Sequence, residues 1–281
     1  MANSGTFRAA CVQMRAGINR HTNIRDSLAL IDEAASAGAN FIATPEMTNV
    51  VDANPKRLFA GLPDGSPLDE IEAFADAAKR HRVWLLAGSF AIKLGDRLAA
   101  NRSHMFADDG RLVCVYDKLH MFDVDLPDGE RWCESNVYKA GDRAIVAKTP
   151  FANVGMTICY DLRFPGLYRR LAQAGADLLC VPSAFTRQTG RAHWQPLLTA
   201  RAIETGSFVI APGQGGDHED GRTTWGHSMI IDPWGKILAA SDNDEPGVIV
   251  ADIDIKDAAM ARTRIPNLGL EQSYEIAILP E

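Results

Sequence analysis

The 281-residue sequence lacks the features that mark secreted, membrane-spanning and nucleic-acid-binding proteins. Residues 1–6 show neither the basic nor the apolar segment of a secretory signal, and no apolar run approaches the roughly 20 residues that span a bilayer. The five cysteines form no C-x-x-C pair, and their odd number argues against a disulfide framework. Basic residues are scattered along a chain of net charge −7, whereas nucleic-acid binding needs clustered Lys and Arg. We therefore expect a cytoplasmic protein without a membrane or nucleic-acid partner.

Strand-like and helix-like periods alternate along a chain of ordinary globular composition, of which 46% is hydrophobic. Residues 35–45 (ASAGANFIATP) align without gaps on residues 172–182 (AQAGADLLCVP), each a helix end, a glycine turn, a buried strand and a proline. Two α/β halves with helices outside predict a four-layer α-β-β-α sandwich, and one doubly wound open sheet is the alternative. No linker rich in Pro, Gly or Ser separates the halves, so we expect residues 1–281 to form a single domain.

Periodicity and turn chemistry assign the elements to residues. We expect helices at 24–37 (capped by Thr22 or Asn23), 68–80, 165–174 and 192–204. We expect strands at 7–14, 41–44, 83–90, 100–107, 111–116, 154–159, 177–181, 208–211, 227–231, 237–240 and 248–253. Residues 118 to about 143 are predicted to be irregular, which is typical of functional loops. The run GQGG at 213–216 predicts a turn.

Three reactive side chains follow predicted strands. Glu46 comes after residues 41–45, Lys118 comes after residues 112–117, and Cys159 closes the strand at 154–158. In open α/β sheets, reactive groups gather where strands end at the carboxyl edge of the sheet. Taken singly, each has an ordinary structural interpretation, as a helix cap, a surface cation and a core thiol. Taken together, they are candidates for acid–base and nucleophilic chemistry.

The contexts of these residues resemble the signature of the nitrilase, or carbon-nitrogen hydrolase, superfamily. That family places a Glu after a short apolar strand and proline, a Lys in a Y-x-K-x-H-x-F context, and a Cys after an apolar strand. Here the stretches read PEM (45–47), YDKLHMF (116–122) and ICYDLRFP (158–165), in the family's order. The stretches GRAHW (190–194), RAIE (201–204) and GHSMIIDPWG (226–235) also fit, so the resemblance runs from about residue 7 to residue 266.

The resemblance implies a thiol hydrolase that acts on carbon–nitrogen bonds other than peptide bonds, without a metal or cofactor. Cys159 is then the nucleophile, at an elbow where backbone N–H groups favour the thiolate. Glu46 is the general base, which takes the thiol proton and returns it to departing ammonia. Lys118 and the Tyr160 backbone N–H would hold the oxyanion. Glu134 matches an additional glutamate that steadies Lys118 and the substrate amide, although a solvated loop carboxylate is the ordinary interpretation.

The residues after Cys159 favour an amidase over a nitrile-hydrolysing enzyme. True nitrilases of this superfamily usually have Trp-Glu there, and this chain has Tyr160-Asp161. The run at 159–165 is similar to the Nit branch, which contains omega-amidases and deaminated-glutathione amidases. The implied substrate is a small carboxylate-bearing amide, namely a 2-oxo acid amide or deaminated glutathione, hydrolysed through a Cys thioester with release of ammonia.

The same resemblance suggests how such a substrate would be held. A guanidinium matches a carboxylate bidentately, so Arg163 would bind the substrate carboxylate. The alternative is that Arg163 pairs with Asp161 or with an outer acid and never meets the substrate. Phe185 and Thr189 would line the pocket.

Several further possibilities stay open from the sequence. Nitrile or N-carbamoyl amino acid hydrolysis could occur on the same fold, acyl transfer to an amine could replace hydrolysis, or the chain could be a silent binding or scaffold member. The intact Glu46, Lys118 and Cys159 argue against a silent member. The resemblance also implies a homodimer or higher homo-oligomer, in which the apolar tail at about 264–281 docks on a partner subunit or folds back on its own domain.

Overall fold

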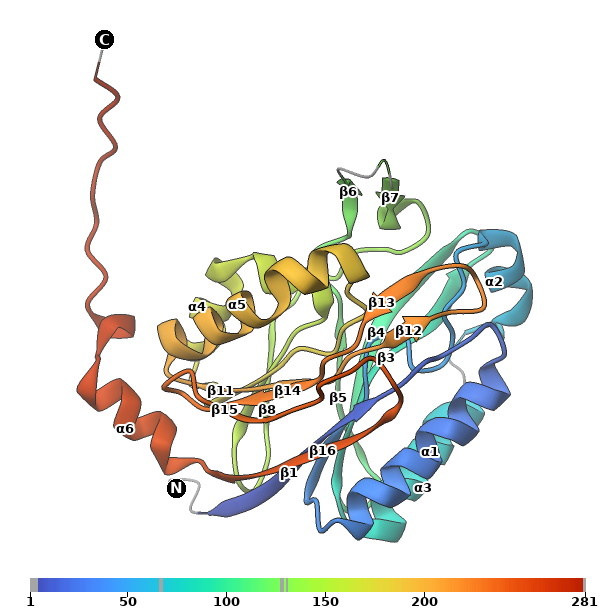
Figure 1. Ribbon diagram of the computed structural model, residues 1–281, viewed down its shortest axis with the longest axis horizontal. Coiled ribbons are helices and arrows are strands. Elements are labelled where there is room, and N and C mark those ends of the chain that lie inside the picture. The colour runs from blue at the N-terminus through green and yellow to red at the C-terminus, as the bar shows by residue number, and fades with distance from the viewer. Residues whose placement is uncertain (1–4, 66–67, 127–128, 130, 280–281) are drawn as a thin grey trace.

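The computed structural model describes residues 5–65, 68–126, 129 and 131–279, and in these residues two mixed six-stranded sheets lie face to face (Figure 1). The first sheet contains, in spatial order, β16 (Gly247–Asp254), β1 (Thr6–Gln13), β2 (Phe41–Ala43), β3 (Trp84–Gly95), β4 (Leu98–Phe106) and β5 (Leu112–Asp117). The second contains β15 (Ile237–Ala240), β14 (Met229–Ile231), β11 (Phe208–Ala211), β10 (Leu178–Cys180), β9 (Asn153–Met156) and β8 (Ile145–Lys148).

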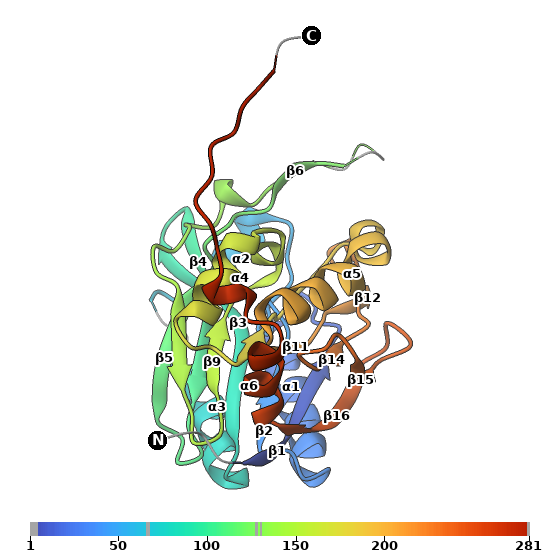
Figure 2. The same cartoon turned by 90° about the vertical axis from the view of Figure 1, so that its left-hand side faces the viewer.

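Helices cover the outer face of each sheet (Figures 1 and 2). On the first sheet lie α1 (Arg20–Ser36) and α3 (Leu68–His81), and on the second lie α4 (Pro165–Gln173) and α5 (Arg187–Thr205). The predicted four-layer α-β-β-α sandwich is therefore confirmed, and the single open sheet is wrong. The other elements are α2 (Pro55–Gly61), α6 (Lys256–Arg264), the short hairpins β6–β7 (Asp123–Asp125, Arg131–Cys133) and β12–β13 (Gly215–Asp217, Thr223–Trp225), and the 3-10 helices η1 (Glu134–Asn136), η2 (Cys159–Arg163) and η3 (Asn267–Gly269).

Alternating side chains on β1 explain why two layers form on either side of the first sheet. Ala9 and Cys11 face inward and join the core between the sheets, whereas Ala10 and Val12 face outward and join the core under α1 and α3. Because successive strand residues point to opposite faces, a strand with two buried faces is apolar throughout. In the described residues, none of the helices combines the length and the apolar character needed to cross a bilayer.

The internal sequence echo corresponds to a real pseudo-symmetry. β2 and β10, which carry the two copies, occupy the same place in their sheets, each between two parallel neighbours. The flanking pairs match as well: β16–β1 and β8–β9 are antiparallel, and so are β3–β4–β5 and β11–β14–β15. Gly38 and Gly175 make the equivalent turns with positive φ, which glycine adopts without steric cost.

Some predicted boundaries are wrong for identifiable reasons. Helix α1 starts at Arg20, because the Asn19 side chain accepts from Thr22 N and caps it; Asn23 is buried and bonds Gly17 instead. Helix α5 likewise starts at Arg187 behind a Thr186 cap. The first turns of both helices contain few apolar residues, so periodicity alone missed them. The 213–216 run is partly strand β12 rather than only a turn.

The C-terminal segment extends away from the body of the molecule after η3 (Figure 2). Four of its apolar side chains are at least 80% exposed: Tyr274, Ile276, Ile278 and Leu279. The Glu271 carboxylate pairs with Arg169 at 2.8 Å, and of the described residues after it, 272–279, none is buried.

Candidate active site

The sandwich brings the ends of three elements to one pocket. Glu46 follows β2, Lys118 follows β5, and Cys159 begins η2 three residues after β9. All three line a cavity of about 590 Å3, to which η1 adds Glu134. The structure therefore brings these three side chains together, as predicted, although they come from both halves of the chain.

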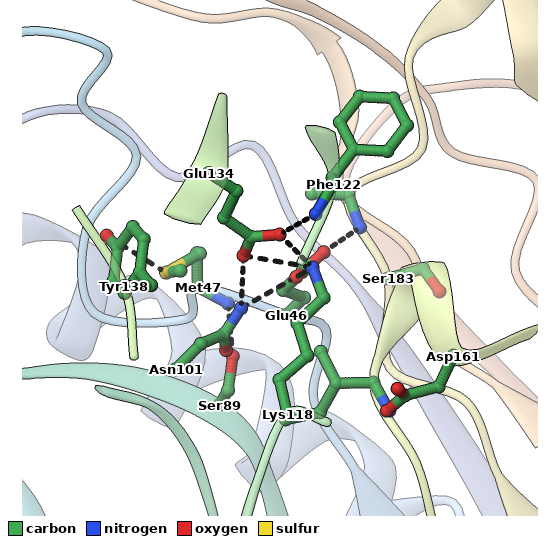
Figure 3. A network of polar contacts seen from close by, with 12 residues as sticks. Glu46, Met47, Ser89, Asn101, Lys118, Phe122, Glu134, Tyr138, Asp161 and Ser183 are labelled. Atoms are coloured by element: carbon green, nitrogen blue, oxygen red, sulfur yellow. Dashed lines mark hydrogen bonds and ion pairs between the residues drawn. The ribbon is translucent and has the colours of Figure 1, made fainter. Parts of the chain in front are cut away.

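Lys118 lies between two carboxylates (Figure 3). Its Nζ is 2.8 Å from Glu46 Oε1 and 3.0 and 2.8 Å from the two oxygens of Glu134. The lysine side chain is only 2% exposed. Burial alone would lower the pKa of Lys118, but the carboxylates of Glu134 and Glu46 raise it well above its ordinary value. Lys118 therefore stays a cation, and Glu134 is a partly buried ion-pair partner, 13% exposed, rather than a solvated loop carboxylate.

The two oxygens of Glu46 face different surroundings. Oε1 accepts from Lys118 Nζ and from Asn101 Nδ2, both at 2.8 Å. Oε2 accepts from Ala184 N at 2.9 Å, and the neighbouring Cys159 thiol also acts to lower the pKa of the carboxyl group. Burial acts to raise the pKa of Glu46, but Lys118 and these donors hold it below its ordinary value. Glu46 is thus ionised and within reach of the thiol proton.

Cys159 sits on a sharp elbow. The ladder of β9 ends at Met156, and the Cys159 N–H donates to Pro182 O at 2.9 Å before the chain turns into η2. Its φ of 47° lies in the left-handed region, which is strained for a residue with a Cβ. The expected strand at 154–159 is therefore too long at its end. This turn aims the side chain into the cavity rather than into the sheet core.

The protonation state of the thiol follows from its surroundings. Burial and the nearby Glu46 carboxylate raise the pKa of Cys159 well above its ordinary value, against the opposing effects of Lys118 and the Ala184 N–H. The resting pair is a neutral thiol next to an ionised carboxylate. Activation of the sulfur therefore requires proton transfer to Glu46 at the moment of attack.

The residues predicted to bind substrate also reach the cavity. Arg163, Phe185 and Thr189 line it together with Tyr160. The Arg163 guanidinium lies 5.9 Å from the Tyr160 ring centroid and 5.4 Å from that of Phe185, and its Nη1 is 3.2 Å from His193 Nδ1. Within the described ranges, no carboxylate lies in ion-pair distance of Arg163.

The sequence profile described as carbon-nitrogen hydrolase matches residues 8–263. The chain belongs to the carbon-nitrogen hydrolase family. It is 40% identical over 256 residues to a deaminated glutathione amidase of Dictyostelium discoideum, covering 88% of either chain. It is 33% identical over 273 residues to an omega-amidase of Homo sapiens, covering 97% of this chain and 98% of the other. The solved NitFhit protein of C. elegans matches with a TM-score of 0.88 at 32% identity, over 96% of this chain and 66% of that longer one.

This carbon-nitrogen hydrolase is therefore an amidase of the nitrilase superfamily with an active-site cysteine. Its Asp161 resolves one alternative left open by the sequence. The carboxylate is fully buried and accepts from Ile158 N, Tyr116 Oη, and both the backbone N and Nδ1 of His120. Pairing of Arg163 with Asp161 is therefore wrong, because Asp161 instead ties the Cys159 elbow to the loop after Lys118.

Two site residues of this carbon-nitrogen hydrolase were missed by sequence reasoning. Asn101 on β4 is fully buried, and its Nδ2 donates to Glu46 Oε1 and to Glu134 Oε1 at 3.3 Å. Gln214 Nε2 donates to the carbonyl of Glu46 at 3.0 Å, 168 residues away. The only sequence signal for Asn101 was a polar residue inside an otherwise apolar strand (LAAN, 98–101).

The turn after Glu46 is held by side chains from other elements. Met47 has a φ of 56°, and its N–H donates to Ser89 Oγ at 2.9 Å. Together with the Gln214 bond, this fixes the strained turn that aims the Glu46 carboxylate at Cys159. Across the described residues, no three His, Cys, Asp or Glu side chains are grouped so as to hold a metal ion. Catalysis without a metal or cofactor stays a prediction.

Proposed function

We propose that this amidase hydrolyses the amide of a 2-oxo dicarboxylic acid, and foremost deaminated glutathione, through a thioester on Cys159. The observation that carries the proposal is the shared pocket of the Cys159 thiol, the ionised Glu46 carboxylate and the buried Lys118 ammonium. Each supplies one requirement of acyl transfer: a nucleophile, a base and a cation for the developing oxyanion.

In the acylation step, Cys159 Sγ attacks the amide carbon while Glu46 Oε2 takes the thiol proton. The carbonyl oxygen becomes an oxyanion, which Lys118 Nζ and the Tyr160 N–H receive. The Tyr160 N–H lies in the first turn of η2, where backbone N–H groups lack an intrahelical acceptor. The carbon–nitrogen bond then breaks, and Glu46 gives its proton to the departing nitrogen, which leaves as a neutral amine.

In the deacylation step, a water replaces the amine beside Glu46. Glu46 takes one proton of the water as the oxygen attacks the thioester carbon. The carbon–sulfur bond breaks, the sulfur regains the proton from Glu46, and the carboxylic acid leaves. Glu134 keeps Lys118 in place throughout, because both of its oxygens accept from Nζ.

The size and charge of the pocket support a carboxylate-bearing acyl group of more than minimal size. A cavity of about 590 Å3 is in the range that holds drug-sized ligands. Arg163 places a guanidinium in it for the acyl carboxylate. Ammonia leaves only from a primary amide; deaminated glutathione has a secondary amide next to its 2-oxo acyl group, so that its leaving group is a peptide amine.

The proposal is tested with purified protein and a panel of amides. The panel contains deaminated glutathione, the primary amide of the same 2-oxo acid, an N-carbamoyl amino acid and a nitrile, and the readouts are amine and ammonia release. We expect turnover of the first two and a Cys159 thioester in the intact protein mass. Turnover of only the nitrile or only the carbamoyl compound would refute the proposed substrate and assign nitrile or N-carbamoyl amino acid hydrolysis instead. No turnover, with Cys159 no more reactive toward iodoacetamide than free cysteine, would favour a silent binding member.

The water in the deacylation step also decides between hydrolysis and acyl transfer. Added hydroxylamine competes with water for the thioester. We expect the free acid as the main product at millimolar amine, with Cys159→Ala giving neither product. Predominant acyl transfer to the amine would make the chain a transferase.

We also propose that the chain works in the cytoplasm as a homodimer or higher homo-oligomer. The exposed apolar side chains of residues 274–279 support this, because an extended apolar segment gains most by covering a second copy. Light scattering of the full chain and of residues 1–271 tests it: a smaller assembly is expected after truncation, and an unchanged mass would assign the tail no part in assembly.

A further inference from the structure

The pocket continues along the segment that follows Glu46. Val50, Val51 and Leu58 line it there, and residues 220–224, in the turn of the β12–β13 hairpin and the start of β13, line it from the other half of the chain. Ala53 N donates to Asp220 Oδ2 at 2.7 Å, so these two segments are in contact. In the proposed mechanism Glu46 returns its proton to the departing nitrogen. The part of the pocket on this side of Glu46 is therefore a candidate site for the group that this nitrogen carries, and is here named the amine lobe.

Arg222 gives the amine lobe a cationic group with hydrogen bonds to spare. Its Nε donates to Asp220 Oδ2 at 2.6 Å, and its side chain is 25% exposed. Among the described residues, neither of its terminal nitrogens, Nη1 and Nη2, has a hydrogen-bond acceptor. Two N–H groups at the end of a guanidinium match the two oxygens of a carboxylate.

The carboxylates near Arg222 are not available to a ligand. Asp220 is inaccessible to solvent and accepts from Arg222 N and Nε and from Ala53 N. Asp52, whose side chain is 1% exposed, accepts from Arg57 Nε and Nη2 at 2.7 and 2.8 Å. The oxygens of both acids are thus occupied by arginine and backbone donors, and Nη1 and Nη2 at the end of Arg222 still offer N–H groups to the lobe.

A row of aromatic rings separates Arg222 from Arg163. The Arg222 guanidinium lies 5.7 Å from the Trp132 ring centroid, Trp132 is 6.2 Å from Phe122, and Phe122 is 5.1 Å from Tyr160, over which Arg163 lies at 5.9 Å. All five side chains line the cavity. The row therefore carries one guanidinium at each end.

We propose that Arg222 binds the carboxylate of the leaving amine, so that the substrate is an amide with a carboxylate on each side of the scissile bond. The acyl half places its carboxylate on Arg163, and the amine half is an amino acid or dipeptide whose carboxylate meets Arg222 and whose body contacts Val50, Val51 and Leu58. This inference rests on the proposed function and adds the second half of the substrate to it.

The test uses four amides with one acyl group, that of the 2-oxo dicarboxylic acid, and different leaving amines. These are ammonia, glycine, glycinamide and alanylglycine, of which only glycine and alanylglycine carry a carboxylate. We expect kcat/KM of the wild-type protein to be higher for glycine than for glycinamide. Arg222→Gln should lower kcat/KM for the two carboxylate-bearing amines about 10- to 100-fold, the range expected for a lost charge-assisted pair. It should leave the primary amide and glycinamide substrates within about twofold.

Arg187→Gln is the matched control. Arg187 also pairs with aspartates near this hairpin, Asp217 and Asp244, but it does not line the cavity. The control should change all four substrates equally. An equal loss on all four with Arg222→Gln would mean that Arg222 only supports the hairpin, and an equal rate for glycine and glycinamide in the wild type would remove the carboxylate subsite. Either result overturns the inference while turnover of the primary amide leaves the proposed function standing.

Discussion

Asn101 offers a sharp test of how the general base is tuned. Its Nδ2 donates to Glu46 Oε1, which Lys118 also contacts, so this oxygen already has two donors. The proton taken from the thiol must then go to Oε2, the oxygen on the other side of the carboxylate. We therefore expect Asn101 to act as a positioning residue that keeps Glu46 ionised and makes only one of its oxygens basic.

The perturbation is Asn101→Leu, which keeps the shape and removes the donor. A hydrogen bond to a charged group contributes about 1.5–3 kcal/mol, and one pKa unit corresponds to about 1.4 kcal/mol. Loss of the Asn101 bond to the anion should therefore raise the pKa of Glu46 by roughly one to two units. Because the base must be deprotonated, the acid limb of the kcat/KM profile should move to higher pH by the same amount.

The same variant should cost little stability. Asn101 Oδ1 is buried and has no hydrogen-bond partner among the described residues, and an unsatisfied buried acceptor costs about 1–3 kcal/mol. Leucine removes that acceptor together with the donor. Because an unsatisfied polar atom in the core lowers stability, the role of Asn101 is in function rather than in stability.

The assay is the pH dependence of kcat/KM from pH 4.5 to 9, with urea unfolding of each variant. Asn23→Ala is the control, since Asn23 is a buried amide with bonds to Gly17 and Asn49 and none to the active site. We expect it to lower stability and leave the pH profile in place. An unmoved acid limb in Asn101→Leu, with a stability loss like that of Asn23→Ala, would refute the reasoning and leave Asn101 a purely structural residue.

Three further predictions concern the surrounding scaffold. Burial lowers the pKa of His104 to about 4, so below pH 6.5 the histidine binds a proton in the unfolded chain but not in the fold, and the fold is destabilised. Between pH 7 and 5, the free energy of unfolding in urea should therefore fall by about 2 kcal/mol less for His104→Leu than for the wild type. Gly88→Ala would push a Cβ into the carbonyls of Thr44 and Pro45, and a variant of full activity and stability would contradict this contact. Asp161→Asn should lower activity, and should lower the free energy of unfolding by about 1–3 kcal/mol, because the new amide N–H group would face the donors of Tyr116 and Ile158. An unchanged free energy of unfolding would show that the hydrogen bonds to Asp161 are dispensable.

The reactive positions could be predicted because their signal is local. Glu46, Lys118 and Cys159 each follow an apolar strand, and strand ends are visible as a change from apolar to polar residues. The repeated motif at residues 35–45 and 172–182 likewise anticipated β2 and β10 in equivalent places. Asn19 and Thr186 were missed as caps, because the helical turns that they start contain few apolar residues to give a period.

The residues that tune the site gave no comparable signal. Asn101 lies inside a strand, and Gln214 was part of a run expected to be a turn; periodicity tells which face a residue occupies but not which side chain it meets. The pKa of the Cys159 thiol could not be predicted for a related reason. Its pKa depends on burial and on a carboxylate 113 positions away in the chain (159 − 46), neither of which the Cys159 context contains.

Neighbours along the chain are enough to predict the alternation of strands and helices, the doubled arrangement of the two halves and the three reactive positions at strand ends. The folded molecule was needed to show that Glu46 Oε1 has two donors, that Glu134 shares Lys118 with Glu46, and that Arg222 lines the same pocket. These depend on donors contributed by segments that meet only when the two sheets close on one core, where low solvent exposure makes each hydrogen bond to a charge strong enough to set its protonation state.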